Sequence, residues 1–373
     1  MSTKIEFTGT IKPLKDGANF KAYDVREFKS GWQNKRLRFN MICGNNAHII
    51  EASSGGWKDE ARNVIYTFSA GTNGQRGQKM QVKWADRNDP EVLDKVANFR
   101  KFVVDLNLPG ALKAAQDAGD DAAIEMAKKR RREFIAETDF VDYLAKLVSS
   151  DKIANMKFKV VGTIEYQYNA VKGQFYKQFK VQKVYRAADD AVPTSTGTMD
   201  VYFTADCVSD MDFETKKQYY ISGYTDFYDS NFKKTLFAPV QLVIDGNGDE
   251  KAAKFAEGLR LKFAKAAEGE VRKICVNVAH LNGAQTREIT YDDLSADEKE
   301  SVDFGLVTLE EMIRQYNNNI IGEKVTATVV TGLAKGYAAG SVEAAWDVSD
   351  LAEPTMEVAD EVEDIFSDDD LDI

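Results

Sequence analysis

Basic and aromatic side chains recur in two stretches of the chain, at positions that alternate with apolar ones. Ammonium and guanidinium groups can follow the phosphates of a nucleic acid, and flat rings can stack on unpaired bases at roughly 1–3 kcal/mol per base. Because every base has a flat face, this chemistry predicts binding to single strands without sequence preference. The candidate nucleic-acid-binding residues are Tyr23, Trp32, Lys35, Arg36, Arg38 and Arg76 in the first stretch, and Tyr176, Lys180, Arg186, Tyr220, Tyr224, Lys233 and Lys234 in the second.

Each of these residues also has an ordinary structural interpretation. Most Tyr and Phe side chains in strands pack in a core or against a neighbouring strand, and an outward Lys is usually only solvated. The hypothesis of a nucleic-acid site therefore depends on the set of residues and not on any single member of it.

Catalytic and metal-binding patterns are missing from the sequence. The chain has two histidines, His48 and His280, and neither has neighbours at the spacing of a metal site. No Gly-x-Ser-x-Gly sequence is present. The Gly-rich loop at 71–79 lacks the Gly-Lys-Ser/Thr ending of a phosphate-binding loop. We therefore expect no enzyme activity, no catalytic residue, no cofactor and no metal.

The last 22 residues form a separate acidic block with ten acids and no Lys or Arg, which leaves 50 acidic and 49 basic residues in the rest of the chain. Such a block repels itself and cannot bury enough apolar surface to fold, so we expect it to be disordered. It could compete with a polyanion for a basic groove, bind a partner protein, or act only as a solubilising tail. The candidate partner-binding residues are Ile365, Phe366, Asp368, Asp369, Asp370, Leu371, Asp372 and Ile373.

Length and composition indicate a globular protein of several domains, with 373 residues, 43% hydrophobic and 29% charged. No apolar run reaches 18 residues, so no membrane span is expected, and the N-terminus lacks the pattern of a secretory signal. Cys43, Cys207 and Cys275 lie far apart without CxxC spacing, which predicts buried thiols in a reducing compartment. The expected location is the cytoplasm.

Strand-like and helical patterns divide the chain into five parts. Residues 1–88 contain five or six short alternating segments without helices between them, which is typical of a small antiparallel barrel. In the clearest of them, 35–43, we expect one side to carry Leu37, Phe39, Met41 and Cys43 and the other to carry Arg36, Arg38 and Asn40. Residues 89–150 have helical patterns and are interpreted as an insert or cover. The basic run at 128–132 is interpreted as a solvated helix face, with a phosphate-binding patch as the alternative. Residues 151–250 predict a second barrel, and 347–373 the disordered acidic tail. Residues 251–346 predict a mixed α/β region, which could be a third, degenerate unit or a dimerisation element.

The two predicted barrels share a pattern near their starts. Phe7-Thr8-Gly9-Thr10-Ile11 matches Val160-Val161-Gly162-Thr163-Ile164. A glycine in mid-strand costs stability unless the strand bends sharply, as the first strand of a small barrel must. The repeated position favours duplication of one unit over a chance match, although the match is short.

These features resemble tandem OB-fold single-stranded DNA-binding proteins encoded by phages and prophages of Gram-positive bacteria. The resemblance is carried by the two strands above, by the acidic tail, and by the segment 217–224, which is similar to the fourth strand of an OB fold. It implies a mainly β protein with helical insertions (α+β), built of tandem OB-like β-barrels. It also implies a tail that recruits replication and repair proteins and competes with DNA. The tail departs from the bacterial pattern by ending in Leu-Asp-Ile.

The sequence thus predicts sequence-independent single-stranded DNA binding in phage DNA replication or recombination, with replication or recombination proteins as partners of the tail. Stacking does not distinguish DNA from RNA. The alternative is a phage structural or assembly protein that uses β modules for protein–protein contacts. A nucleic-acid binder should gather Arg36, Arg38, Tyr176 and Lys180 into continuous positive grooves. A structural protein should scatter them and expose a large apolar patch instead.

Overall fold

The computed structural model describes residues 3–17, 20–71, 77–284, 291, 294–316 and 324–352, and within them the protein is mainly β with several helices, as the sequence predicts. The first ten strands are β1 (Lys4–Pro13), β2 (Tyr23–Glu27), β3 (Trp32–Cys43), β4 (Asn46–Trp57), β5 (Val64–Phe68), β6 (Lys79–Lys83), β7 (Phe102–Asp105), β8 (Arg131–Phe134), β9 (Lys157–Asn169) and β10 (Gln174–Arg186). The others are β11 (Thr194–Phe203), β12 (Val208–Ser209), β13 (Gln218–Asp229), β14 (Lys234–Asp245), β15 (Arg272–Ala284), β16 (Lys324–Leu333) and β17 (Val342–Glu343).

The α-helices lie mainly in the segments that connect these strands. They are α1 (Pro90–Lys95), α2 (Ala111–Ala118), α3 (Asp121–Arg130), α4 (Glu137–Val148), α5 (Phe213–Lys216), α6 (Glu250–Phe263), α7 (Ala296–Asp303) and α8 (Leu309–Tyr316). Short 3-10 helices are η1 (Glu60–Arg62), η2 (Trp84–Asp86), η3 (Asn98–Arg100), η4 (Asp151–Ile153) and η6 (Val348–Leu351). Asp89, Ser295 and Thr308 cap the N-termini of α1, α7 and α8.

Five strands form the first barrel. β3 pairs antiparallel with β1 and β4, and β9 pairs antiparallel with β1 and β10. β10 then runs parallel to β4, with Phe179 opposite Ile50 and Lys180 opposite Glu51, and so closes the barrel. This is the strand order of an OB fold, a five-stranded Greek-key barrel.

The second barrel repeats the same pairing with β11, β13, β14, β15 and β16. β13 pairs antiparallel with β11 and β14, while β15 pairs antiparallel with β11 and β16. The closing parallel contact, between β14 and β16, places Val243 opposite Val329. In each barrel one helix precedes the fourth strand, α4 in the first and α6 in the second, and each buries its apolar face in the core. The chain therefore contains two OB-like barrels in tandem.

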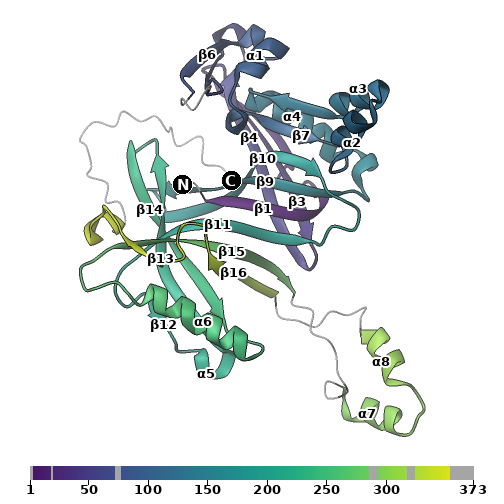
Figure 1. Cartoon of the computed structure of the whole chain (residues 1–373), viewed down its shortest axis with the longest axis vertical. Helices are drawn as coiled ribbons and strands as arrows, with labels where there is room; N and C mark the ends of the chain where they lie inside the picture. The colour runs from purple at the N-terminus through teal and green to yellow at the C-terminus, as the bar shows by residue number, and fades with distance from the viewer. Residues whose placement is uncertain are drawn as a thin grey trace.

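The two barrels share one hydrogen-bonded sheet (Figure 1). Their first strands pair antiparallel, from Lys4 opposite Thr198 to Thr8 opposite Thr194. A second junction lies between β4 and β15, where the Asn282 side chain donates to the carbonyl oxygen of Ala47 at 2.6 Å. The barrels are thus held in a fixed relative position by backbone as well as side-chain contacts.

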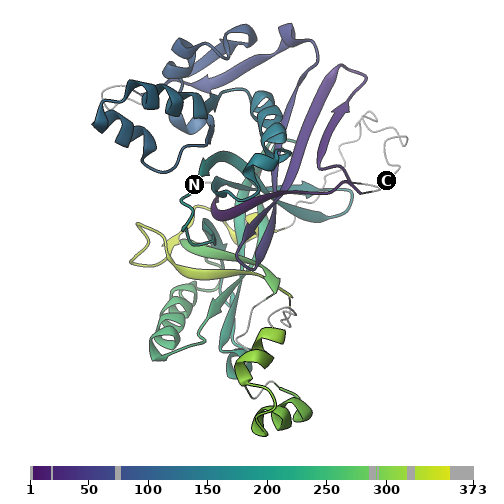
Figure 2. The same ribbon diagram turned by 90° about the vertical axis from the view of Figure 1, so that its right-hand side faces the viewer.

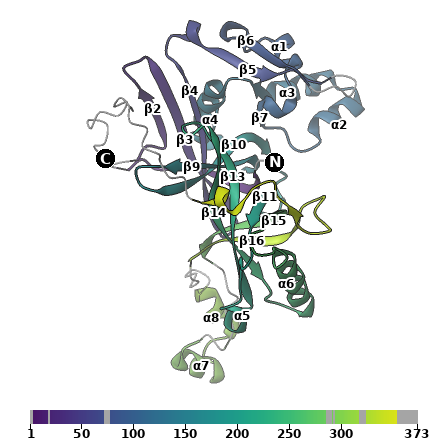
Figure 3. The ribbon, with the colours of Figure 1, turned by 90° about the vertical axis from the view of Figure 1, so that its left-hand side faces the viewer.

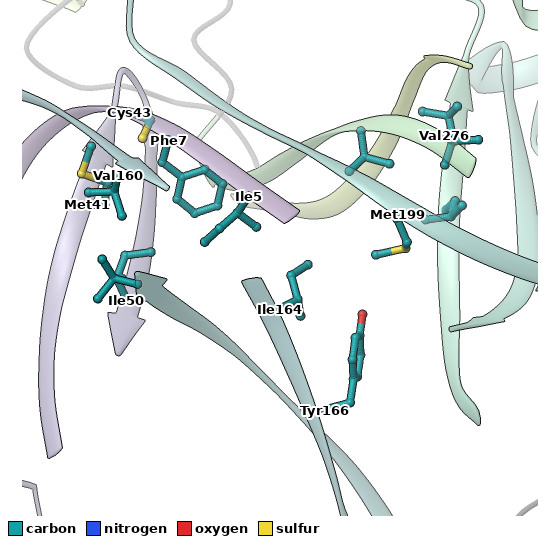
Figure 4. Close-up of a cluster of buried hydrophobic side chains, with 14 of the residues drawn as sticks. Ile5, Phe7, Met41, Cys43, Ile50, Val160, Ile164, Tyr166, Met199 and Val276 are labelled. Carbon is teal, nitrogen blue, oxygen red and sulfur yellow. The ribbon is translucent and has the colours of Figure 1, made fainter. Parts of the chain in front are cut away.

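A single apolar core runs through both barrels (Figure 4). Strand alternation explains it, because β1 sends Ile5, Phe7 and Ile11 inward while Glu6, Thr8 and Thr10 are partly or fully exposed. Met41 and Cys43 of β3 and Val276 of β15 belong to the same buried cluster. The inward set expected for β3 is therefore confirmed.

The barrel boundaries differ from those expected. Strands β9 and β10, which we assigned to the second barrel at 151–250, pair with β1 and β4 and complete the first. The second barrel instead takes its last two strands from the region expected to be mixed α/β. Segment 217–224 lies in the second strand of the second barrel, not in a fourth strand. Alternation identifies strands but not their partners, and the helical insert separates the third and fourth strands of the first barrel.

The repeated Gly-Thr-Ile pattern is explained by the pairing of β1 with β9 in the first barrel. β1 and β9 are neighbours in one barrel, with Phe7 opposite Val160 and Ile5 opposite Gly162. A Cβ on Gly9 would lie 1.9 Å from the carbonyl oxygen of Ile42, and a Cβ on Gly162 would lie 1.8 Å from that of Lys180. The glycines allow neighbouring strands to approach closely, so the match reflects two strands of the first barrel rather than the starts of two barrels.

The insert between β4 and α4 contains more strand than its sequence predicts. Helical patterning to about Leu106 gives way to β7, and the basic run at 128–132 begins in α3 and ends in β8. β7 runs parallel to β10 and extends the sheet of the first barrel. β5 and β6, which we expected to belong to the barrel at 1–88, instead form a separate two-stranded hairpin. The insert is thus attached to the barrel through β7 and lies beside β3 and β4 (Figure 1).

Further expectations concern the cysteines and membrane spans. Cys43, Cys207 and Cys275 are buried and free, and burial raises the pKa of each thiol to about 12. In the described part of the chain, no helix is long and apolar enough to cross a membrane. The acidic tail from residue 353 onward, with its partner-binding residues, lies outside the described residues.

Replacing Gly9 with Ala should destabilise the protein, because the new methyl group would overlap the backbone of Ile42. We expect the free energy of unfolding to fall by about 1–3 kcal/mol, as in overpacked cores, measured by urea denaturation. Gly258→Ala is the matched control, since nothing lies within 4 Å of a Cβ at this position in α6. If Gly9→Ala lowered the free energy of unfolding no more than Gly258→Ala does, the result would contradict the close approach of β1 and β3.

Candidate nucleic-acid interface

The outer face of the first barrel carries the main group of candidate residues. Side chains that alternate with the buried positions of β3, β4 and β10 point outward there. The register places Arg38 opposite Glu51. Glu51 is in turn opposite Lys180 across the barrel closure. Three strands therefore bring these side chains together.

Glu51 lies at the centre of this group and is only 4% exposed. Its carboxylate is 3.0 Å from Lys180 Nζ, 3.2 Å from Arg38 Nε and 3.6 Å from Arg36 Nε. The Lys180 ammonium also donates to the hydroxyl of Ser53. One carboxylate thus positions three cations, and the cluster keeps a positive excess that could bind phosphate. We call Arg36, Arg38, Glu51 and Lys180 the cation cluster.

Two adjacent cavities lie along this face. One, of about 340 Å³, is above the cation cluster, and the other, of about 420 Å³, lies between the ends of β3 and β4 and the insert. Both are lined by Lys35, Ser54, Gly55 and Glu137. They therefore form one groove that runs from the barrel face to the insert.

Aromatic rings line the groove on the side of the insert. Tyr66 of β5 and Phe99 of η3 are 78% and 69% exposed, and both border the larger cavity. The Arg100 guanidinium lies 5.5 Å from the centre of the Phe99 ring. Exposed rings beside cations are the pairing that unpaired bases and their phosphates need.

Two tryptophans mark the end of the groove. Trp32 and Trp57 meet edge to face with ring centres 5.2 Å apart. The Trp32 ring lies over Gly55, where a Cβ would come within 2.6 Å of it. The Arg62 guanidinium covers Trp57 at 3.5 Å from its ring centre. Trp32 is thus held rigidly beside the groove.

Two predicted residues of the first stretch are bound to helix α4. Lys35 Nζ is 2.6 Å from one carboxylate oxygen of Asp142, and the Tyr23 hydroxyl donates to the other at 2.8 Å. Burial and this hydrogen bond raise the pKa of Tyr23 to about 12. Lys35 still lines both cavities. Arg76 lies outside the described residues.

Candidates of the second stretch are dispersed. Tyr176 stands outward on β10 and is 39% exposed, whereas Arg186, at the end of that strand, is 3.5 Å from Asp189 and borders a different cavity near Leu108. Tyr220 and Tyr224 lie on β13, and Lys233 and Lys234 at the β13–β14 turn. These four belong to the second barrel and do not meet the cation cluster.

Among the described residues, the closure of the second barrel carries no equivalent cluster, because Val243 and Val329 occupy the contact where the first barrel has Glu51 and Lys180. Part of its outer face is also covered by the segment at 342–352. Leu351 is buried there against Tyr202 and Phe237, and Trp346 meets Phe237 with ring centres 5.2 Å apart. This barrel is therefore not a copy of the first in its surface chemistry.

The end of β4 and the insert supply groove residues that the sequence did not predict. Trp57, Tyr66, Trp84, Phe99 and Arg100 all line the larger cavity. The adjacent Phe99-Arg100 pair carried the expected chemistry, but it lay in a region interpreted as a helical cover. In the described residues, no group of His, Cys, Asp or Glu is arranged to hold a metal ion.

No protein-family model matches the chain, and no curated protein matches it. Among solved structures it is similar to the wild-type single-stranded DNA binding protein from Thermus aquaticus, with 9% identity and a TM-score of 0.29 over 74% of this chain and 85% of that one. A deletion mutant of that protein gives 10% identity and the same TM-score over 74% and 86%. At this TM-score, the OB-like assignment rests on the strand pairing alone.

Neutralising Glu51 should destabilise the first barrel, because three cations would then face one another without their carboxylate. We expect Glu51→Gln to lower the free energy of unfolding by about 1–3 kcal/mol, the usual cost when a buried charge partner is removed. Glu165→Gln is the control, since Glu165 is 3.6 Å from Lys180 but half exposed. Equal urea midpoints for the two variants would show that Glu51 does not hold the cluster.

Proposed function

We propose that this protein binds single-stranded DNA without sequence preference, through the groove of its first barrel. It acts in the replication or recombination of phage DNA. The acidic tail competes with DNA for the groove and recruits replication or recombination proteins. The groove needs no cofactor or catalytic residue for this role.

The observation that supports the proposal best is the cation cluster beside exposed rings. Arg36, Arg38 and Lys180 are held by a buried carboxylate, so their positions are fixed before a ligand arrives. Tyr66 and Phe99 present ring surface at the other end of the same groove. Cations that contact phosphates and rings that stack on bases supply affinity without reading a sequence.

The arrangement also supports nucleic-acid binding over the structural or assembly alternative. That alternative requires the basic residues to be scattered, whereas Arg36, Arg38 and Lys180 converge on one carboxylate. Strands 2 and 3 of an OB fold are the usual binding face for oligonucleotides. In this chain those strands are β3 and β4, which carry Arg36 and Glu51 and contribute to the lining of both cavities.

The tail has a defined starting point for its competing role. Leu351 is buried on the second barrel, so the acidic residues begin one or two residues beyond a fixed position. The 21 residues after Ala352 can extend at most about 70 Å. Ten carboxylates tethered at this position raise the local concentration of negative charge around a basic groove.

Removing the groove rings should weaken binding to single strands. We expect Tyr66→Ala and Phe99→Ala each to raise Kd by about 5- to 150-fold, which corresponds to about 1–3 kcal/mol per stacked base. The measurement is fluorescence anisotropy with labelled oligo-dT at several salt concentrations. The slope of log K against log salt should be near −0.7 per phosphate contact.

The matched control for the ring variants is Tyr228→Ala, since Tyr228 is 68% exposed but lies on β13 of the second barrel. It should bind as the unaltered protein does. An unaltered protein that binds duplex DNA as well as oligo-dT, even at low salt, would overturn the proposed function and restore the assembly alternative. Wild-type affinity in both ring variants would instead move the site away from the groove.

Ending the chain after Leu351 should tighten binding to oligo-dT at low salt, because the competing carboxylates are removed while the buried leucine is kept. The difference should shrink as salt rises, since screening weakens attraction between the tail and the groove. Titrations of the full and shortened chains at matched salt concentrations test this. Identical affinities at all salt concentrations would limit the tail to partner binding or solubility.

A further inference from the structure

Helices α7 and α8 form an acidic hairpin that projects from the second barrel (Figures 1 and 2). Between residues 294 and 316 the sequence has six acids against Lys299 and Arg314. The hairpin has its own supports. Leu294 and Met312 are buried, and the Tyr291 hydroxyl donates to Asp303 at 2.7 Å. We call residues 294–316 the acidic hairpin.

The turn of the acidic hairpin exposes two large apolar side chains. Phe304 is 71% exposed and Leu306 is 75% exposed. Helices of eight residues are marginal by themselves, and two exposed apolar groups add a further cost. A contact that covers these groups and pairs the surrounding carboxylates would offset both costs.

A surface of opposite charge lies on the insert. Lys129 and Arg130 at the end of α3 and Arg132 on β8 are exposed. Among the described residues none of the three is in an ion pair, whereas Lys128 pairs with Glu125 and Arg131 pairs with Asp105 and Glu133. Met126, 55% exposed, stands three and four residues before Lys129 and Arg130 on α3, and so on the same face. We call Met126, Lys129, Arg130 and Arg132 the basic ridge.

The acidic hairpin and the basic ridge lie at opposite ends of the molecule in all three views (Figures 1, 2 and 3). In this structure they therefore do not meet within one chain. A contact between the hairpin of one copy and the ridge of the next is head-to-tail. In such a pair, one copy keeps a free hairpin and the other keeps a free ridge. Such a contact can repeat along a linear ligand.

We propose that the acidic hairpin of one copy docks on the basic ridge of a second copy, so that molecules on one strand bind cooperatively. This inference rests on the proposed function. Exposed charge pairs contribute little each, so the contact is weak in free solution. Neighbours on one strand are held at high local concentration, and there a weak contact is sufficient.

The test uses charge reversal on each side of the contact in the full chain. Lys129→Glu with Arg130→Glu alters the ridge, and Glu300→Lys with Asp303→Lys alters the hairpin. Cooperativity is the ratio of affinity for a long oligo-dT that holds several copies to affinity for a short one that holds a single copy. We expect each double variant to lower this ratio about fivefold to tenfold, with unchanged affinity for the short strand. The variant with all four changes should regain at least half of the loss.

Two controls separate the contact from general effects. Lys251→Glu with Lys265→Glu makes the same change of charge at exposed positions in and just after α6, and should keep the cooperativity. Tyr291→Phe removes the same hydrogen bond as Asp303→Lys but does not change the charge. This variant should also keep the cooperativity. Loss of cooperativity in either control would overturn the assignment to these two surfaces.

Other outcomes are equally decisive. If the ridge variant loses affinity for the short strand, the ridge binds DNA phosphates and the proposal is wrong. If the four-change variant recovers none of the lost cooperativity, the hairpin is not the ligand of the ridge. The same follows if the ridge changes no longer lower cooperativity when both the variant and the unaltered protein are ended after Leu351. If the unaltered protein does not bind the short strand, the proposed function fails instead. The contact can then be tested separately by mixing two isotope-labelled forms of the protein and treating them with a carbodiimide. A cross-link between Glu300 of one copy and Lys129 of another would support the contact, and the absence of this cross-link would contradict the contact.

Discussion

Closure of the first barrel is the constraint on which the candidate site depends. The parallel contact between β4 and β10 brings Lys180 to Glu51, two residues far apart in the sequence. Arg36 and Arg38 reach the same carboxylate only because β3 pairs with β4 in a single register. A shift of that register by one residue would turn both arginines toward the core. The charge of the groove is therefore a product of strand pairing.

The two barrels show how one topology supports different surfaces. Their pairing patterns agree strand by strand, including the parallel closure. At that closure one barrel has a buried carboxylate with its cations, and the other has two valines. The second barrel also packs the segment at 342–352 on its outer face. One barrel thus supplies the groove, and the other anchors the start of the tail.

The sequence predicted the positions of strands better than it predicted which strands pair and which side chains meet. Alternation correctly identified β3, with Leu37 and Phe39 inward and Arg36 outward, because burial on one face leaves a direct trace in the sequence. It did not predict Glu51 as the centre of the cation cluster, since the sequence around an acidic residue does not show which side chains lie opposite it on neighbouring strands. Phe99 was missed because the groove wall belongs to an insert whose position depends on β7 pairing with β10.

The central place of β1 has a consequence for how the chain folds. This strand precedes all of its partners β3, β9 and β11 in the chain, and the residues that pair with it extend to Thr198. The first barrel cannot close until β10 has been synthesised, and β1 must then still leave an edge for β11. Such non-local pairing makes folding slow and exposes strand edges in the meantime. The insert, with its own hairpin and helices, is made before either closing strand and can acquire local structure during that wait.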